Sequence, residues 1–326
     1  MALMTRRIRR TAALCASLAF ALLAAEAGLR VLGKFEPPNS PPVPRYPGFY
    51  RPDPEIGYTL WPSRQTTYRY PIGSSNEVTL VSNADGFRNA RDFDSPDSRP
   101  RIWVLGDSMV LGDGVAAENR LTEVIEALQP KWRVDNLGMT GYGIDLMIRV
   151  FERLSKRVKP DVVVLGFYTD DFRRLHPFNA GQGYPFPKFE LQSGQLVTVP
   201  FPVLPAWRRL RVVQAIEQSY WRLTRNRFAL HGALMDRLQQ RVRERGAALV
   251  VTFLPGTGDT PEDVERRTWL RHWCQQAGIP FFDLTDAIHA AGSAAFIPNN
   301  PHWNERGHRV AGEAIRAFLT QTVLRD

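Results

Sequence analysis

The stretch that decides the fold is WVLGDSMVLGDGV, residues 103–115. An apolar run ends at Gly106, and Asp107 and Ser108 follow where the chain turns toward a helical pattern. Asp and Ser both cap helix N-termini well, so a capped turn explains these residues without any chemistry. The alternative is that the strand ends here in order to present the Ser108 hydroxyl at the edge of a sheet. The rest of the chain has to decide between the two.

From residue 101 onward, short apolar runs alternate with helical patterns. Continuous apolar strands separated by helices predict a parallel sheet covered on both faces, here a three-layer α/β/α doubly wound domain with about five strands. Functional loops of such a domain lie beyond the carboxyl ends of the strands, where Ser108 stands. The predicted strands are 101–105, 133–137, 161–165, 248–254 and 279–282, and the predicted helices are 121–128, 145–157, 228–245 and 261–277.

The N-terminal segment, residues 1–35, predicts export. A basic cluster at 6–10 precedes an apolar run over 11–29 whose one charge is Glu26. As a helix this run spans about 28 Å, close to the ~30 Å hydrocarbon core, which predicts an uncleaved membrane anchor. Ala25-Glu26-Ala27 also fits a signal-peptide cleavage site, so a cleaved leader stays open. The arginines stay cytoplasmic in both cases, which predicts a single-pass protein of the bacterial inner membrane or a secreted or periplasmic one.

Three further segments complete the predicted organisation. Residues 36–54 are dense in proline and predict a semi-rigid linker. Residues 55–100 carry short β-rich pieces and form a small region ahead of the main domain, 101–326. Within that domain, residues 176–211 are an insertion rich in proline, glycine and aromatic residues, with a predicted hairpin over 188–199. Its place after the third strand suggests a lid or a substrate wall, with a merely decorative loop as the alternative.

Charge and composition argue against several classes of protein. The 326 residues carry a formal net charge of +9, of which Arg6, Arg7, Arg9 and Arg10 supply four. No stripe of Lys and Arg alternates with aromatic residues, so we expect no nucleic-acid partner. The two cysteines give neither a disulfide framework nor a metal motif. His302 and His308 have no matching acidic or cysteine ligands nearby, so we expect no metal and no cofactor.

Three more segments place glycines or polar groups at the ends of predicted elements. Glycine lets a backbone N–H approach a ligand closely, which suits Gly141 after the second strand. A histidine can act as the general base of a serine, which suits His302 before the last helix. Taken singly, tight turns, helix caps and structural hydrogen bonds explain these segments as well. They are Asn136–Gly143, Gly166–Asp171 and Asn299–His308.

Together with Gly106-Asp107-Ser108, these segments resemble the SGNH (GDSL) hydrolase superfamily, and residues 53–88 are similar to the N-terminal part of its membrane-anchored bacterial members. The resemblance implies a flavodoxin-like fold with Ser108 as nucleophile, His302 as base, and the N–H groups of Ser108 and Gly141 as oxyanion hole. It implies acyl transfer from an ester through an acyl-enzyme, to water in a hydrolase or to an alcohol in a transferase. A Gly-x-Ser-x-Gly elbow is excluded because Val110 stands where it needs glycine.

Two positions depart from the family pattern. Asp170 stands where the family has an asparagine that donates to the oxyanion. An ionised carboxylate there would repel the oxyanion by about 4 kcal/mol at ~4 Å and an effective dielectric constant of ~20. The aspartate that orients the histidine is replaced by an amide, Asn299 or Asn300. One hypothesis is that the roles are exchanged, with Asp170 serving His302 and an asparagine serving the oxyanion; a degraded site is the alternative.

The sequence therefore predicts an exported serine ester hydrolase, and the resemblance favours O-acetylated carbohydrate of the envelope, a polysaccharide, as substrate. The expected partners are this ester and the membrane that holds residues 1–35. A lipase or lysophospholipase-like esterase would instead need a long apolar groove, whereas a deacetylase needs a small acyl pocket beside an open polar cleft. A non-enzymatic binding or scaffold protein remains the third alternative.

Overall fold

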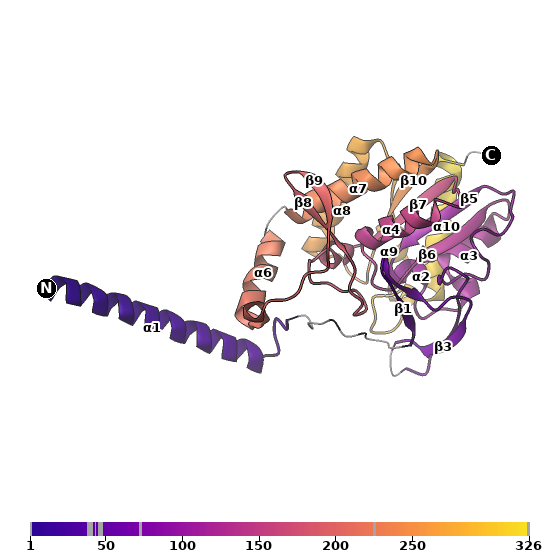
Figure 1. The fold of residues 1–326 in the computed structure, drawn as a ribbon. Helices are drawn as coiled ribbons and strands as arrows, with labels where there is room; N and C mark the ends of the chain where they lie inside the picture. The colour runs from indigo at the N-terminus through magenta and orange to yellow at the C-terminus, as the bar shows by residue number, and fades with distance from the viewer. Residues whose placement is uncertain are drawn as a thin grey trace. The chain divides into compact units, whose positions relative to one another are not determined.

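The structure, a computed structural model, describes residues 2–37, 42, 44, 48–71, 74–223 and 226–324 (Figure 1). The chain forms two compact units. The larger comprises Pro44–Phe201 and Phe228–Asp326, and the smaller comprises Met1–Val43 and Pro202–Arg227. The predicted insertion 176–211 is thus divided between the two units.

The larger unit is built on a five-stranded parallel sheet with the order β11-β10-β7-β5-β6. Counted along the chain this is 2-1-3-4-5, the flavodoxin-like order, in which the strand order reverses beside the first strand. A crevice therefore forms at the carboxyl end of β5, and the predicted fold class is confirmed. The strands are β5 (Arg101–Gly106), β6 (Arg133–Gly138), β7 (Val162–Tyr168), β10 (Ala248–Leu254) and β11 (Phe281–Asp283).

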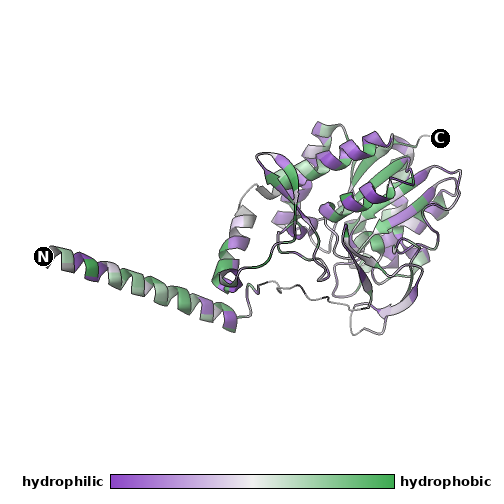
Figure 2. Ribbon diagram, in the orientation of Figure 1, coloured by the Kyte–Doolittle hydropathy of each residue, from purple (hydrophilic) through white to green (hydrophobic). Residues whose placement is uncertain are grey.

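Helices cover both faces of this sheet (Figure 2), which explains why β5, β6, β7 and β10 are almost wholly buried, while the edge strand β11 is half-buried. One face carries α3 (Leu121–Leu128), α9 (Thr285–Ala290) and α10 (Glu305–Thr322), whose apolar residues share a core with alternate strand residues. The other face carries α4 (Ile144–Leu154), α7 (Asn226–Glu244) and α8 (Pro261–Ala277). The Trp103 ring of β5 meets the Phe151 ring of α4 there at 6.0 Å. The short elements are α2 (Ser108–Leu111), η1 (Ala117–Asn119), α5 (Asp171–Arg174) and η3 (Gly292–Ala295).

Local sequence sets the ends of α8 where the pattern predicts them. Thr260 Oγ1 accepts from the Asp263 N–H at 3.2 Å, and the Asp263 carboxylate accepts from the Thr260 N–H at 3.0 Å. Pro261 takes the first helical position, where its missing N–H costs nothing. Gly278 ends the helix in a left-handed conformation, with φ at 66°.

Within the larger unit, the β-rich region forms two antiparallel pairs, β1 (Tyr50–Asp53) with β2 (Gly57–Leu60) and β3 (Gln65–Arg69) with β4 (Glu77–Val81). β1 lies within the segment for which the sequence predicts a linker. Buried Arg88 donates to the carbonyls of Gly112 at 2.7 Å and Val115 at 2.8 Å. The region therefore holds the loop that follows Ser108.

The predicted hairpin is confirmed as β8 (Lys188–Gln192) and β9 (Gln195–Val199). Buried Lys188 ties its base to α4, with Nζ 3.6 Å from Asp145 Oδ2 and 2.9 Å from the Asn179 carbonyl. The smaller unit contains α1 (Ala2–Val31), η2 (Ala206–Arg209) and α6 (Arg211–Leu223). Within the described part of the chain, one helix is long and apolar enough to cross a membrane, over Arg6–Val31, and a signal sequence would pass the same test.

Candidate active site

Ser108 lies at the carboxyl end of β5 as the first residue of α2. The strand stops at Gly106 because the turn closes tightly there: a Cβ on this residue would lie 2.2 Å from Val110 Cγ2. Asp107 caps α2, with Oδ1 accepting from the Met109 N–H at 2.9 Å. Both interpretations of the opening stretch therefore hold, because Asp107 caps the turn and the turn places Ser108 at the sheet edge.

A buried ion-pair network holds this serine loop. Arg174 Nη1 lies 2.7 Å from Asp107 Oδ2, pairs with Asp171, and donates to the Tyr142 carbonyl at 2.8 Å. Burial raises the pKa of Asp171 well above its usual value, and Arg174 opposes this shift. Burial also lowers the pKa of Arg174, but the Asp107 and Asp171 charges outweigh it and leave that pKa above its usual value. Removing Arg174 would leave two uncompensated carboxylates, which typically costs ~3–5 kcal/mol.

His302 faces Ser108, with Nε2 2.8 Å from the serine Oγ. This is the distance that proton transfer between a nucleophile and its base requires. The loop that carries His302 is fixed from both sides. The buried indole of Trp303 donates to the Pro255 carbonyl at 3.1 Å, and Asn304 caps α10.

Asn300 fixes the tautomer of His302. Asn300 Oδ1 accepts from the His302 backbone N–H at 2.9 Å, so this atom has to be the amide oxygen. The same oxygen lies 2.7 Å from His302 Nδ1, which therefore carries the hydrogen and donates it. Nε2 is left with a lone pair that points to Ser108 Oγ. The imidazole is thus in the form that a general base requires.

Asp170 and Asn299 lie elsewhere. The Asp170 side chain follows β7, is 42% exposed, and has Oδ1 3.5 Å from Arg173 Nη1. Among the interactions of the described residues, it makes no hydrogen bond or ion pair with Ser108 or His302. The hypothesis of exchanged roles expected Asp170 to accept from His302 Nδ1. The acceptor in the structure is Asn300, and Asp170 pairs with Arg173 of its own turn. Asn299 adopts a left-handed φ of 56° and lines a neighbouring pocket.

Gly141 follows β6 in a left-handed conformation, with φ at +83°. A Cβ there would lie 2.9 Å from Gln182 Nε2 and 3.0 Å from Tyr58 Oη, so glycine is required. Tyr58 steadies the turn by donating to the Thr140 carbonyl at 2.7 Å. Within the described residues, the backbone N–H groups of Ser108 and Gly141 have no hydrogen-bond acceptor. Both are available to a bound oxygen.

Asp113 is a buried carboxylate beside the site that sequence reasoning missed. Its Oδ2 accepts from Thr140 Oγ1 at 2.7 Å, and its Oδ1 accepts from the Tyr68 hydroxyl at 3.2 Å. Burial raises the pKa of Asp113, and the charge that opposes this shift most is that of His302. Asp113 therefore connects the histidine electrostatically with the turn that carries Gly141. Nothing in the pattern Gly112-Asp113-Gly114 marks it beforehand.

Tyr70 is a second missed residue. Its hydroxyl lies 2.9 Å from His302 Nδ1, and the two rings meet edge to face with centroids 5.3 Å apart. It comes from the β-rich region, 232 residues from the histidine in sequence. That region therefore forms one wall of the candidate site.

His308 has a structural place instead. It is buried, and its Nδ1 accepts from the Leu121 N–H at 3.3 Å. Burial, together with the charges of Arg120 and Arg88, lowers the pKa of His308 to about 3, so the ring stays neutral. In the described part of the chain, no group of three or more His, Cys, Asp or Glu side chains is placed to hold a metal ion.

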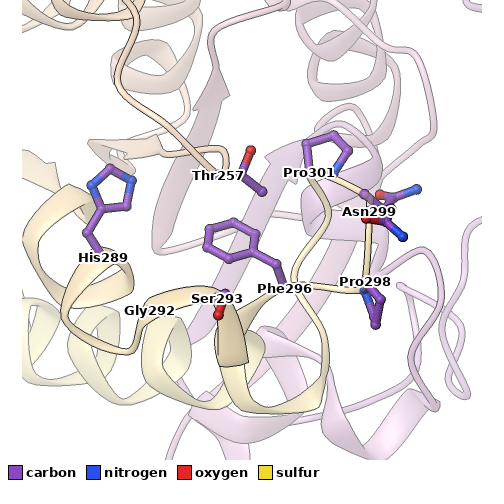
Figure 3. Close-up of a pocket in the computed structure, with 9 residues that line it drawn as sticks. Thr257, His289, Gly292, Ser293, Phe296, Pro298, Asn299 and Pro301 are labelled. Carbon is purple, nitrogen blue, oxygen red and sulfur yellow. The ribbon is translucent and has the colours of Figure 1, made fainter.

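A pocket of about 430 Å³ adjoins the histidine loop (Figure 3). The flat faces of Phe296 and Pro301 stand there beside the Thr257 hydroxyl, with His289 farther along. Polar and flat apolar groups thus both line a space beside the loop that carries His302. The lining residues are Thr257, His289, Gly292, Ser293, Phe296, Pro298, Asn299, Asn300 and Pro301.

Residues 104–310 match the model of the GDSL-like lipase/acylhydrolase family. Similar solved structures include the psychrotrophic esterase EstA from Pseudoalteromonas sp., at 11% identity over 69% of this chain and 100% of that chain, with a TM-score of 0.45. The lipase/acylhydrolase from Enterococcus faecalis is 14% identical over 68% of this chain and 95% of that one, with a TM-score of 0.44. No curated protein matches the chain significantly.

Proposed function

The chain belongs to the GDSL-like lipase/acylhydrolase family, and we propose that it is an active serine esterase with Ser108 as nucleophile and His302 as general base. The observation that carries the proposal is the 2.8 Å contact between His302 Nε2 and Ser108 Oγ. The amide oxygen of Asn300 supports it by keeping the hydrogen on Nδ1. A merely structural histidine would not need this tautomer.

The proposed reaction has two halves. His302 Nε2 takes the Ser108 proton while Oγ attacks the ester carbonyl, and the N–H groups of Ser108 and Gly141 stabilise the oxyanion. The intermediate collapses, the alcohol leaves with the proton from His302, and an acyl-serine remains. A water molecule then gives a proton to His302 and attacks the acyl carbon, and the second intermediate collapses to release the acid as Ser108 Oγ takes that proton back from His302. An alcohol in place of that water would make the reaction a transfer.

The imidazolium formed in each half needs a negative partner, and Asn300 carries no charge. We propose that Asp113 supplies it from a distance, since its buried carboxylate interacts with His302 without a direct hydrogen bond. Its bond to Thr140 also links it to the turn that carries Gly141. One carboxylate would then serve both the base and the oxyanion hole.

For the substrate we propose an ester of a carbohydrate, with a short acyl group such as acetyl. The pocket beside the histidine loop supports this class because its lining combines hydroxyl, amide and imidazole groups with the flat faces of Phe296 and Pro301. A sugar ring presents the matching pattern of hydroxyl groups and apolar C–H faces. A long acyl chain would leave these polar groups without partners, which costs binding energy.

For the location we propose a single membrane span with the catalytic unit outside the cytoplasm. The apolar helix over Arg6–Val31 and the arginines at its start support this orientation. The alternative, release after cleavage of the leader, predicts a shorter mature chain whose N-terminus follows Ala27. N-terminal sequencing of the protein recovered from the envelope distinguishes the two.

The test of the activity uses the full-length chain in detergent with p-nitrophenyl esters from acetate to decanoate, and with acetylated xylan. We expect the highest kcat/KM with acetate, acetate release from the polysaccharide, and loss of both in Ser108→Ala. A maximum at decanoate would contradict the short acyl group and favour a lipase-like esterase. Equal rates for the wild type and Ser108→Ala would contradict the esterase and favour a scaffold protein. The amide of Asn300 in place of a carboxylate at His302 Nδ1 would then explain the lack of activity.

A further inference from the structure

The smaller unit joins two parts of the chain that are far apart in sequence, and a charged residue of α1 makes the first contact. The Val212 N–H at the start of α6 donates to Glu26 Oε2 at 2.9 Å, while Glu26 Oε1 lies 2.7 Å from Arg30 Nε. Glu26 is the one acidic residue in the apolar run of α1, and this contact buries it. A carboxylate at a helix N-terminus satisfies free N–H groups and the helix dipole, which gives Glu26 a structural reason.

Arg211 makes the reciprocal contact at the end of α1. Its Nη1 donates to the carbonyls of Leu29 at 3.1 Å, in the last turn of α1, and of Lys34 at 3.0 Å, just beyond the end of that helix. Its Nη2 lies 3.1 Å from Glu36 Oε1. The two helices therefore cap each other, which fixes the start of α6 beside the last turns of α1.

These caps set the level of α6 in the membrane. A helix rises about 24 Å from Arg10 to Glu26, and the hydrocarbon core is ~30 Å thick. Glu26 therefore lies close to the interface opposite the basic cluster, and the start of α6 lies at the same level. In Figure 1, α6 runs across the direction of α1 rather than alongside it, as a helix in the plane of the interface would.

The segment around this contact exposes large apolar side chains. Val203 is 84% exposed, Trp207 57% and Ile216 63%, and Leu210 and Tyr220 are exposed as well. Ile216 and Tyr220 lie one turn apart on the same face of α6. Isolated exposed apolar residues are ordinary, but several within one short segment indicate a surface that something apolar covers.

We propose that residues 202–223 form an interfacial arm that lies in the headgroup region of an anionic phospholipid bilayer, and this rests on the membrane anchor proposed above. Trp207 and Tyr220 are of the residue types that favour this level of a membrane. The segment holds four arginines, at 208, 209, 211 and 222, against one acid, Glu217, which pairs with Arg208 at 2.9 Å, so its net charge is positive and suits anionic lipid. Any bilayer that holds α1 brings its surface to the exposed side chains, whereas a protein partner would have to be added.

The arm changes how the catalytic unit is attached. The chain passes between the two units at three places, after Val43, after Phe201 and after Arg227. A span alone would be joined to the catalytic unit at one place, but the arm adds two connections that start from the bilayer surface. The catalytic unit is thereby joined to the membrane-bound unit at three points of the chain rather than one.

The test labels single cysteines of the full-length chain with a fluorophore in phosphatidylcholine/phosphatidylglycerol vesicles that carry nitroxide lipids. Cys15→Ser and Cys274→Ala provide the background for Trp207→Cys, Ile216→Cys and the control Leu128→Cys, an exposed apolar residue of α3 in the larger unit. We expect headgroup nitroxide to quench positions 207 and 216 at least about threefold more strongly than position 128. Aqueous iodide should show the opposite order. Equal quenching at all three positions would overturn the arm.

Two further readouts separate this proposal from the others. Cys15, kept in the Cys274→Ala protein, reports whether α1 is inserted, and a lack of quenching by acyl-chain nitroxide there would also overturn the arm. Hydrolysis of soluble p-nitrophenyl acetate by the same vesicles reports the esterase alone. Strong quenching without hydrolysis contradicts the esterase, and hydrolysis with uniform quenching contradicts the arm.

Discussion

The loop after β5 and the loop after β7 both end at the carboxyl edge of the sheet, yet they use their carboxylates differently. In the first, Asp107 and Asp113 are buried and each contacts a group that positions the site. In the second, buried Asp171 pairs with Arg174 and so supports the first loop, while Asp170 turns to Arg173. We therefore expect the second loop to act as scaffold, with the proposed chemistry concentrated on the first loop and on the histidine loop.

The largest expected effect tests the first loop. We expect Ser108→Ala to lower kcat for p-nitrophenyl acetate by at least about 10⁴-fold, since it removes the nucleophile and leaves only binding and the oxyanion hole. The Tm should stay within a few degrees of the wild-type value, because alanine differs from serine only by the lost hydroxyl group. A kcat that remains within tenfold would place the nucleophile elsewhere and break the comparison.

The next effect concerns the amide at His302. We expect Asn300→Ala to lower kcat by about 10²–10³-fold, because Nδ1 loses the acceptor that selects its tautomer. Asn300→Asp is the matched control, since a carboxylate can accept from the same two N–H groups. It should keep or raise kcat, because it also brings charge to the imidazolium. Equal losses in both variants would mean that Asn300 does not act through His302.

A smaller effect is expected at Asp113. Asp113→Asn should lower kcat by about tenfold, or ~1.4 kcal/mol, because the charge that faces His302 is lost. Tyr68→Phe is the control, since it removes one hydrogen bond to Asp113 and leaves the charge. A rate for Asp113→Asn within twofold of the wild type would remove Asp113 from the account.

The same variant, Asp113→Asn, is expected to lose activity without losing stability. Burial raises the pKa of Asp113, so the folded chain holds its proton more firmly than the unfolded chain, and the free energy of unfolding falls as pH rises above about 3.8 through the raised value. Asparagine carries no charge to desolvate, so at pH 7 we expect Asp113→Asn to unfold at the same Tm or higher. A variant that loses both rate and Tm would point to a merely structural Asp113.

The smallest effect is expected in the second loop. Asp170→Ala should change kcat by less than about threefold, since the exposed side chain pairs only with Arg173 and exposed ion pairs contribute little. A pH–rate profile that matches the wild type should accompany it. A tenfold change would show that Asp170 reaches the reacting groups, and would restore the hypothesis of exchanged roles.

Local pattern made the sheet, most helices and the position of Ser108 predictable. Buried strands read as continuous apolar runs, and α8 carries its own start and stop signals. Tyr70 and Asp113 could not be predicted in the same way, because their roles depend on contacts between distant segments. The sequence likewise could not choose between Asn299 and Asn300, because the choice depends on the backbone conformation of the histidine loop. In that loop the Asn300 side chain accepts a hydrogen bond from the His302 backbone N–H, whereas Asn299 adopts a left-handed conformation.

The central claim is that Ser108 and His302 form a working pair although the orienting group is an amide. Reaction of the full-length chain with a fluorophosphonate probe, followed by peptide mass spectrometry, tests it most directly. We expect a single adduct on Ser108 that is absent from Ser108→Ala and forms more slowly in Asn300→Ala. No adduct under conditions that label a control serine hydrolase would contradict the account.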